Sequence, residues 1–303
     1  MRPRDLPQEE LFTASLSCSG CGMATAVRLT LKVLGPRTIF VCPAACLSTV
    51  SCYFPHMPFR IPMIVMAFAS TGAALQGISA ALKMQGKEDI HVVGFAGDGG
   101  TVDIGLQSLS NAIEGGRKFI YICYDNEAYM NTGVQRSGAT PYGATTATTP
   151  GKAREDTPKK DMLGIVAAHN IPYAATACVS YPQDYMEKVY RASEVNGPTY
   201  IHVLTPCPPG WGFPTERTIE IGRMAVESGM WELKEFSGGK FRTTYTPRKR
   251  RKLSEYFATQ TRFGQLTAEE TAQLQQELDA RLAMEEAATD RWSMEAADCL
   301  NLK

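Results

Sequence analysis

The chain has 303 residues, of which 44% are hydrophobic and 20% charged, so it is long enough for one large α/β domain or two small ones. Its 31 Lys and Arg residues equal its 31 Asp and Glu residues, and this balance argues against a nucleic-acid or membrane-surface partner. Residues 1–12 lack the apolar core of a signal peptide, and the most apolar stretch, 61–82, is interrupted by proline, glycine and glutamine. We therefore expect a cytoplasmic protein that binds neither nucleic acid nor a membrane.

Helical and strand patterns alternate along the first two-thirds of the chain. The patterns predict helices at 23–33, 71–83, 103–116, 162–169 and 182–194, and strands at 38–41, 90–95, 119–124, 173–178 and 199–204. Residues 42–60 and 132–160 are predicted to be loops, and a long loop in a compact domain usually serves a site. The alternation predicts an α/β fold with a doubly wound, mostly parallel sheet.

The composition changes after residue 245, and we divide the chain there into an α/β domain (1–245) and a C-terminal tail (246–303). The tail begins with a basic run, PRKRRK, at 247–252. Thr267 and Glu270 then form a capping-box pattern at the start of a long polar helix. Leucines recur along this helix in one narrow stripe, at Leu274, Leu278 and Leu282. A narrow stripe predicts an arm that docks on another surface, such as that of a neighbouring subunit.

The clearest unit is a strand, helix and strand between residues 90 and 124. A glycine turn, Gly97-Asp98-Gly99-Gly100, ends its first strand, and Asp125-Asn126 ends its second. Because the two strands run parallel, both ends reach the sheet edge where α/β proteins bind ligands. Glycines there let the backbone approach a phosphate, but an acidic side chain would repel it. Asp98 and Asn126 therefore predict a divalent cation that bridges to a diphosphate; the alternative is a plain tight turn followed by a turn asparagine.

Glycine-Asp-glycine followed by asparagine one βαβ unit later resembles the thiamine-diphosphate motif. Residues 97–150 resemble the beta subunits of pyruvate synthases, which belong to the 2-oxoacid:ferredoxin oxidoreductases, and the run DNEAYMNTGVQRSGATP at 125–141 is close to a signature of that family. The resemblance extends over 15–213 and more loosely to residue 263. It implies a sheet of the thiamine-diphosphate-binding type, with cysteine-bearing loops and a helical C-terminal arm.

The resemblance also implies roles for single residues of the glycine turn and of the segment after the second strand. The Mg²⁺ ligands would be the side chains of Asp98 and Asn126 and the backbone carbonyl of Ala128. Asn131 matches a catalytic asparagine that faces the reacting end of thiamine and the substrate. Three glycines would lie along the diphosphate, namely Gly97, Gly99 and Gly100.

Nine cysteines are many for a protein of a reducing compartment and suggest a metal or redox centre. Cys18 and Cys21 form a C-x-x-C turn, a spacing that lets two thiolates hold one metal or two corners of a cluster. Further ligands could come from the proline-containing loops, where the candidates are Cys42, Cys46, Cys52 and Cys207. The residues alone leave structural zinc and an iron–sulfur cluster equally open, whereas a thioredoxin-like dithiol fits less well.

The family resemblance favours a 4Fe-4S cluster, with ligands that match Cys18, Cys21, Cys46 and Cys207. Cys42, one helical turn before Cys46, is the main rival for the third position. The remaining cysteines are expected to have no ligand role, namely Cys52, Cys123, Cys178 and Cys299.

The function implied by the resemblance is the reversible, coenzyme A-dependent oxidative decarboxylation of pyruvate, with electrons passed to ferredoxin. The implied partners are an alpha subunit that supplies the glutamate on the pyrimidine side of thiamine, and gamma and ferredoxin-like delta subunits or domains. The basic run at 247–252 is expected to be a solvated face, and a docking site for an acidic partner such as ferredoxin is the alternative. Alternatives are another 2-oxoacid or oxalate as substrate, a non-redox thiamine-diphosphate decarboxylase with structural zinc, and a non-catalytic metal-binding module.

Overall fold

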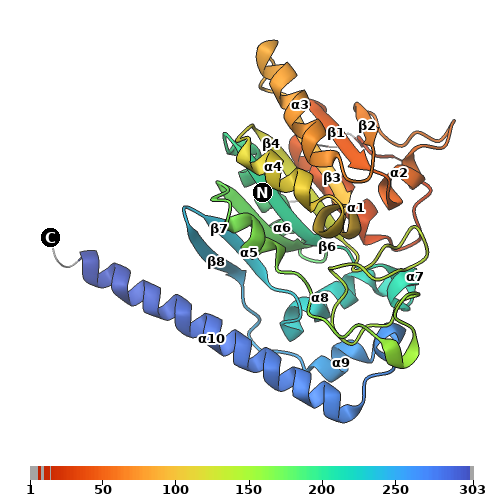
Figure 1. Cartoon of the computed structure of the whole chain (residues 1–303), viewed down its shortest axis with the longest axis vertical. Helices are drawn as coiled ribbons and strands as arrows, with labels where there is room; N and C mark the ends of the chain where they lie inside the picture. Colours follow the sequence, from red (N-terminus) through yellow and green to blue (C-terminus); the bar gives the residue numbers. More distant parts are fainter. Residues whose placement is uncertain (1–5, 8–9, 14, 301–303) are drawn as a thin grey trace.

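The structure is a computed structural model that describes residues 6–7, 10–13 and 15–300, with side chains up to residue 284 (Figure 1). Its centre is an eight-stranded sheet in the order β2-β1-β3-β4-β6-β5-β7-β8. The strands are β1 (Thr38–Pro43), β2 (Met63–Met66), β3 (His91–Gly97), β4 (Phe119–Asp125), β5 (Tyr173–Cys178), β6 (Pro198–Leu204), β7 (Leu233–Ser237) and β8 (Lys240–Tyr245). Strands β1 to β6 pair in parallel, and β7 and β8 extend the sheet as an antiparallel hairpin.

Ten α-helices and four short helical turns connect the strands in the described part of the chain. The α-helices are α1 (Gly22–Leu34), α2 (Cys46–Ser51), α3 (Thr71–Met84), α4 (Leu106–Glu114), α5 (Met162–Ala167), α6 (Pro182–Glu194), α7 (Pro208–Trp211), α8 (Thr218–Ser228), α9 (Leu253–Phe257) and α10 (Ala268–Leu300). The turns are η2 (Gly99–Asp103), η3 (Gly151–Ala153), η4 (Thr215–Arg217) and η5 (Thr261–Phe263). Within the described residues, no helix is long and apolar enough to cross a membrane.

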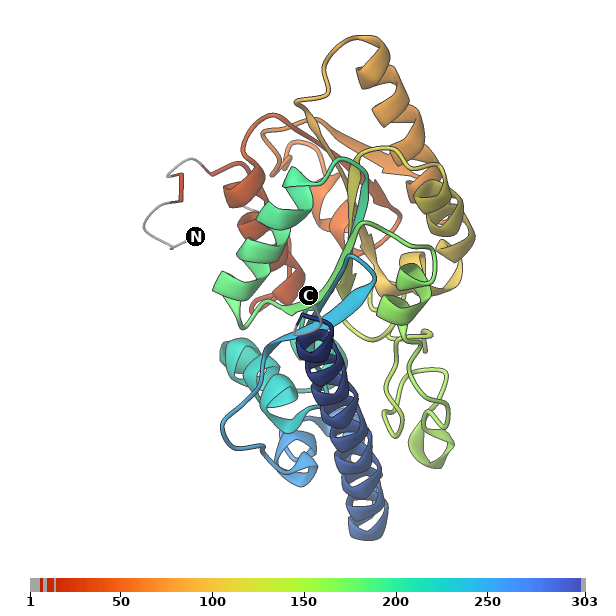
Figure 2. The same ribbon diagram turned by 90° about the vertical axis from the view of Figure 1, so that its left-hand side faces the viewer.

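Helices cover both faces of the sheet. Successive residues of the central strands point to opposite sides, so that Val93 and Ile122 pack in the cluster with α1 and α6, while Val92 and Cys123 pack with α3, α4 and α5. Figure 2 shows α1 and α6 on one side of the sheet and α3 and α4 on the other. The predicted doubly wound, mostly parallel fold is confirmed.

A third hydrophobic cluster joins the C-terminal helices to the α/β domain. Leu278 and Leu282 of α10 are buried in it, with Leu274 packed at its margin, together with side chains of α7, α8 and α9. The leucine stripe therefore docks on this chain itself, and the prediction that it is an arm for a neighbouring subunit is wrong for residues 274–282. The capping box is confirmed, because Thr267 N–H donates to Glu270 Oε2 at 2.9 Å and Glu270 N–H donates to Thr267 Oγ1 at 3.2 Å.

All five helices and five strands predicted before residue 205 are present, but several elements were missed. Strand β2 is a four-residue edge strand inside an apolar run, where no alternation marks it. Helices α2 and α7 lie in proline-containing stretches that were predicted to be loops. The β7–β8 hairpin turns at Gly238 and Gly239, which have φ angles of 57° and 77°. The division at residue 245 stays a prediction.

Candidate cofactor site

The glycine turn and the segment after β4 meet at one edge of the sheet. Strands β3 and β4 pair in parallel up to the register Gly97–Tyr124, so the residues that follow each strand emerge side by side. Asp98 comes first after β3 and is buried, and the π-turn η2 follows it. Asn126, Glu127 and Ala128, which follow β4, are buried as well. This placement is the one predicted from the βαβ unit.

The glycines of the turn accommodate aromatic neighbours. A Cβ on Gly99 would lie 2.2 Å from the Tyr129 ring, and one on Gly100 would lie 3.0 Å from the Phe68 ring. Gly97 has the same kind of neighbour, because its Cβ would lie 3.3 Å from the Tyr124 ring. A side chain at Gly99 would therefore displace Tyr129, and the predicted contact of these glycines with a diphosphate stays a prediction.

The three predicted Mg²⁺ ligands converge. The side-chain amide of Asn126 places one terminal atom 3.1 Å from Asp98 Oδ1 and 3.0 Å from the backbone carbonyl oxygen of Ala128. Without a cation the amide nitrogen donates to both oxygens; with the amide turned over, its oxygen would lie 3.1 Å from Asp98 Oδ1 and 3.0 Å from the Ala128 carbonyl oxygen. Adjacent ligands of an octahedral Mg²⁺ with bonds of about 2.1 Å lie roughly 3 Å apart, so the spacing fits that cation.

Asp98 is a buried carboxyl group, and its ionised form is unfavourable unless a cation is near it. Ser137 Oγ donates to Asp98 Oδ2 at 2.5 Å. Burial raises the pKa of Asp98 well above its ordinary value of 3.8, and the negative charge of Asp125 raises it further. A bound divalent cation would reverse this penalty by stabilising the ionised form. The electrostatics of the site therefore match the geometry.

Asp125 plays a different part from Asp98. Its Oδ2 lies 2.6 Å from Lys159 Nζ and 2.8 Å from His202 Nε2, and its Oδ1 accepts the backbone N–H of Glu127 at 2.8 Å. Burial alone would raise the pKa of Asp125, but Lys159 and His202 outweigh burial and lower it to about 2. Asp125 is thus a fixed anion that holds the segment carrying Asn126. His202 is buried as well, and both of its ring nitrogens have hydrogen-bond partners, Asp125 and Tyr200.

Asn131 differs from the three proposed Mg²⁺ ligands because it is not buried. It is exposed in the turn between Tyr129 and Val134, where the Val134 N–H donates to the Tyr129 carbonyl at 3.0 Å. The turn packs against the glycine segment, because Tyr129 contacts Gly99 and donates through its hydroxyl to Asp103 at 2.9 Å. The predicted role of Asn131 toward substrate stays a prediction.

The C-x-x-C turn packs against the loop before Cys207. Cys21 N–H donates to the Cys18 carbonyl at 3.1 Å, and Gly22 N–H donates to the Pro206 carbonyl at 3.3 Å. A Cβ on Gly22 would lie 2.8 Å from the Thr205 carbonyl carbon, so only glycine allows this approach. The N-terminal turn and the loop after β6 are therefore neighbours in the fold.

Cys46 lies at the start of α2, and the charges of the same thiols affect its pKa. Burial, and after it the charges of Cys207, Cys21, Asp98 and Cys18, together raise its pKa to about 12. The rival, Cys42, is buried in β1, and its pKa is raised to about 12 by burial and by Cys52 instead.

The backbone contact thus brings the C-x-x-C turn next to the Cys207 loop, and only electrostatic effects relate Cys46 and Asp98 to these thiols. Within the described residues, however, no group of three or more His, Cys, Asp or Glu side chains is spaced to hold a metal ion. Among the other cysteines, Cys52 is exposed, while Cys123 and Cys178 are buried in the core. The Cys299 side chain lies outside the described residues.

Several residues of the site were missed from the sequence. Ser137 binds Asp98, Lys159 binds Asp125, and Arg262 binds Glu127 at 2.7 Å. Lys159 lies in a polar loop and Arg262 in the C-terminal segment, where nothing in the local pattern distinguishes them from solvated charges. The 17-residue signature run contains Ser137 and could have drawn attention to it.

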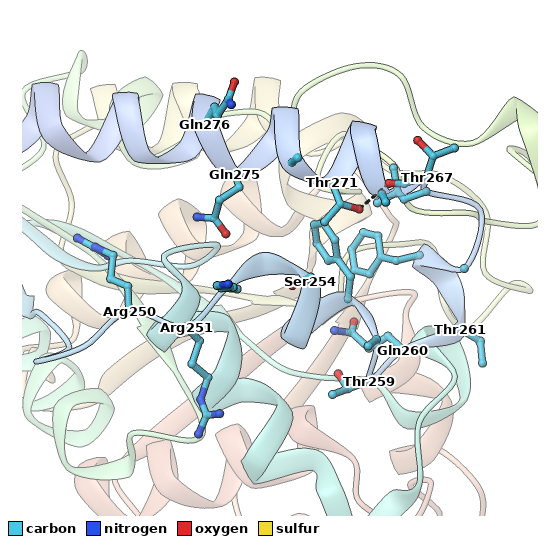
Figure 3. A pocket seen from close by; sticks show the side chains of 18 of the residues that line it. Arg250, Arg251, Ser254, Thr259, Gln260, Thr261, Thr267, Thr271, Gln275 and Gln276 are labelled. Carbon is cyan, nitrogen blue, oxygen red and sulfur yellow. Dashed lines mark hydrogen bonds between the residues drawn. The ribbon is translucent and has the colours of Figure 1, made fainter.

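A large groove of about 1040 Å³ lies elsewhere, between α9 and α10 (Figure 3). Arg250, Ser254, Thr261 and Gln275 are among the side chains that line it, and none of the predicted site residues does. Its size therefore says nothing about the chemistry at the sheet edge.

Comparison with known proteins agrees with this site. Residues 46–203, which include Asp98 and Asn126, match the family described as "Thiamine pyrophosphate enzyme, C-terminal TPP binding domain". The pyruvate synthase subunit PorB of Methanothermobacter thermautotrophicus is 52% identical over 91% of this chain and 97% of the relative. The chain belongs to the family of PorB-type oxidoreductase subunits. The ketoisovalerate oxidoreductase subunit VorB of Pyrococcus furiosus is 45% identical over 89% of this chain and 90% of the relative.

The fold has a counterpart among solved structures. A 2-oxoglutarate:ferredoxin oxidoreductase from Magnetococcus marinus superimposes with a TM-score of 0.57 at 20% identity, covering 90% of this chain and 94% of that one. At this identity the likeness concerns the fold alone.

Proposed function

We propose that this chain is the subunit of a pyruvate:ferredoxin oxidoreductase that binds thiamine diphosphate, Mg²⁺ and a 4Fe-4S cluster. The observation that carries the proposal is the position of the Asn126 side-chain amide at the end of β3, 3.1 Å from Asp98 Oδ1 and 3.0 Å from the Ala128 carbonyl oxygen. The match of residues 46–203 to a thiamine-pyrophosphate-binding family supports the cofactor, because this segment contains all three ligands.

Each cofactor is held by residues with a defined task. When bound, thiamine diphosphate supplies the nucleophile and electron sink for decarboxylating a 2-oxoacid, and an iron–sulfur cluster accepts electrons one at a time. Asp98, Asn126 and the Ala128 carbonyl would hold the cation that neutralises the diphosphate. Asp125 and Lys159 keep the segment carrying two of these ligands fixed. Four cysteines would hold the cluster, namely Cys18, Cys21, Cys46 and Cys207.

The mutual effects of these thiols support the cluster. Cys18 and Cys21 both contribute to the raised pKa of Cys207, and all three contribute to that of Cys46. Zinc would satisfy the same thiolates but could not accept electrons. In the overall reaction pyruvate, coenzyme A and two equivalents of oxidised ferredoxin give acetyl-coenzyme A, CO₂, a proton and two equivalents of reduced ferredoxin, in either direction.

Pyruvate is the substrate proposed here because three PorB relatives, all from methanogens, are 48–52% identical to this chain, against 45% for the VorB relatives; two other PorB relatives are 44–45% identical. The branched 2-oxoacid of the VorB relatives is the second candidate. The relatives are named as subunits, which supports partner chains: an alpha subunit supplying the pyrimidine-side glutamate, and gamma and ferredoxin-like delta subunits or domains. We propose a cytoplasmic location for the assembly.

The test is metal and substrate analysis of the assembled enzyme, purified without oxygen. We expect iron and acid-labile sulfide near four of each per copy of this chain, beyond the amount held by other subunits, and a higher kcat/KM for pyruvate than for 2-ketoisovalerate. Zinc in place of this iron would overturn the redox assignment. A preference for 2-ketoisovalerate would overturn only the substrate.

A further inference from the structure

Trp211 connects the two proposed cofactor regions through one turn of helix. Helix α7 begins after Cys207, and its last residue, Trp211, donates its backbone N–H to the Cys207 carbonyl at 2.9 Å. The Trp211 indole N–H donates to the backbone carbonyl of Asn126 at 2.7 Å. The indole is fully buried, so neither bond competes with water. Cys207, a proposed cluster ligand, and Asn126, a proposed Mg²⁺ ligand, are thus both hydrogen-bonded to Trp211.

The guanidinium group of Arg262 packs on the face of the Trp211 indole ring. Its guanidinium carbon lies 3.8 Å from the Trp211 ring centre, a close cation–π contact. The same guanidinium pairs with Glu127 Oε2 at 2.7 Å and donates through Nε to Gln260 Oε1 at 2.9 Å. Only 4% of the Arg262 side chain is exposed. The planar group therefore touches both the ring that contacts Asn126 and the residue that follows Asn126.

Glu127 needs such support. Its backbone has a φ of 67°, the left-handed region that a glutamate rarely adopts without outside contacts. Lys159 holds its Oε1 at 2.9 Å, and Thr140 Oγ1 donates to its backbone carbonyl at 2.8 Å. This conformation turns the chain between Asn126 and Ala128, so that both can face Asp98.

We infer that Arg262 and Trp211 are positioning residues that fix the Mg²⁺-binding segment and the Cys207 loop relative to each other. The inference rests on the proposed function and deepens it. Arg262 lies in the C-terminal segment, outside residues 46–203 that match the thiamine-pyrophosphate-binding family. Residues 253–263 therefore help to position the cofactor ligands, although none of them is proposed to touch a cofactor.

Two conservative variants of the assembled enzyme test this. Trp211→Phe keeps a ring beneath the guanidinium but removes the indole N–H, and Arg262→Lys keeps a charge for Glu127 but loses the planar stack. The matched control is Arg251→Lys, because Arg251 lies just before residues 253–263 and pairs with Glu227 and Glu255 but is 47% exposed. Calorimetric titration gives thiamine-diphosphate affinity at fixed Mg²⁺, and electron paramagnetic resonance at controlled potentials gives the cluster's midpoint potential.

We expect Trp211→Phe and Arg262→Lys each to weaken thiamine-diphosphate binding by about tenfold and to shift the cluster's potential, with the control like wild type. Wild-type values for either property in both variants would overturn the inference, even if their melting temperatures fall. If Arg262→Lys does not fold, Trp211→Phe decides alone. Wild-type enzyme that binds no thiamine diphosphate or holds no cluster in this chain would instead overturn the proposed function.

Discussion

Replacing Asp98 with asparagine should separate the effect of this residue on folding stability from its effect on cofactor binding. The variant keeps the shape and the contact with Ser137 but removes the charge that a cation needs. In the cofactor-free chain the carboxyl is buried beside Asp125, and its pKa is raised for that reason. We therefore expect Asp98→Asn to leave the free energy of unfolding unchanged or to increase it, while cofactor binding is lost.

The size of the loss follows from the ligand count. Three protein ligands are proposed for the cation, namely Asp98, Asn126 and the Ala128 carbonyl, and Asp98 carries the only formal charge among them. Loss of a residue that merely orients a metal ligand costs 10- to 100-fold in affinity, so loss of this ligand should cost at least about 100-fold, or about 2.7 kcal/mol. Isothermal titration of the assembled enzyme with thiamine diphosphate and Mg²⁺ measures it. Undiminished affinity would refute the magnesium site.

Asp103 provides a matched control with the opposite sign. Burial opposes ionisation there, but bonds from Lys160, Gly138 and Tyr129 prevail and lower its pKa. Its stabilising effect is present above the unfolded value of 3.8 and lost as the pH falls, whereas the raised pKa of Asp98 makes stability fall as the pH rises through it. Asp103→Asn should thus destabilise the cofactor-free chain by about 1 kcal/mol. Equal destabilisation by Asp98→Asn in thermal unfolding would contradict the reasoning.

Three further predictions concern the thiols, the C-terminal helix and the buried lysine. Serine at Cys46 should lower the iron content of anaerobically purified enzyme, while serine at Cys42 should not; the reverse result would exchange the third ligand. The same loss is expected for serine at Cys18, Cys21 or Cys207. Leu282→Ala should destabilise the chain by about 3 kcal/mol in denaturant unfolding, and exposed Met284→Ala by less than about 0.5 kcal/mol, because only Leu282 packs in the core; equal effects would mean that α10 does not dock. Lys159→Met should cost about 3 kcal/mol because buried Asp125 and Glu127 both lose their lysine partner, and Asp125 keeps only His202 and the Glu127 N–H; an unchanged melting temperature would show that the lysine contributes little.

The central fold could be predicted because its signals are local. Buried strands such as 119–124 are continuous apolar runs between glycine and proline breaks, and the helices between them have one apolar face. Strand β2 and the β7–β8 hairpin gave weaker signals, since the first is short and the second is largely exposed on β8. The Gly238-Gly239 pair between two alternating segments was the signal that could have predicted the hairpin.

The site was predicted in part for a related reason. Asp98 and Asn126 each follow a strand directly, so sheet geometry alone brings them together. The leucine stripe was assigned to a neighbour because a sequence does not show that α8 and α9 offer it a surface. Arg262 lies 135 residues after Glu127 in sequence, and only the packing of the C-terminal segment beneath α7 brings the two together.

The most direct test follows the proposed cluster of this chain by electron paramagnetic resonance while pyruvate and coenzyme A are added without oxygen. In the assembled enzyme with thiamine diphosphate and Mg²⁺, we predict that a reduced 4Fe-4S signal appears and that Asp98→Asn abolishes it. In the chain alone we predict no pyruvate-dependent reduction, and the alpha subunit should restore it. Robust reduction by the isolated chain, or an undiminished signal in Asp98→Asn, would contradict the proposal that this subunit supplies the cation-binding half of a shared thiamine site.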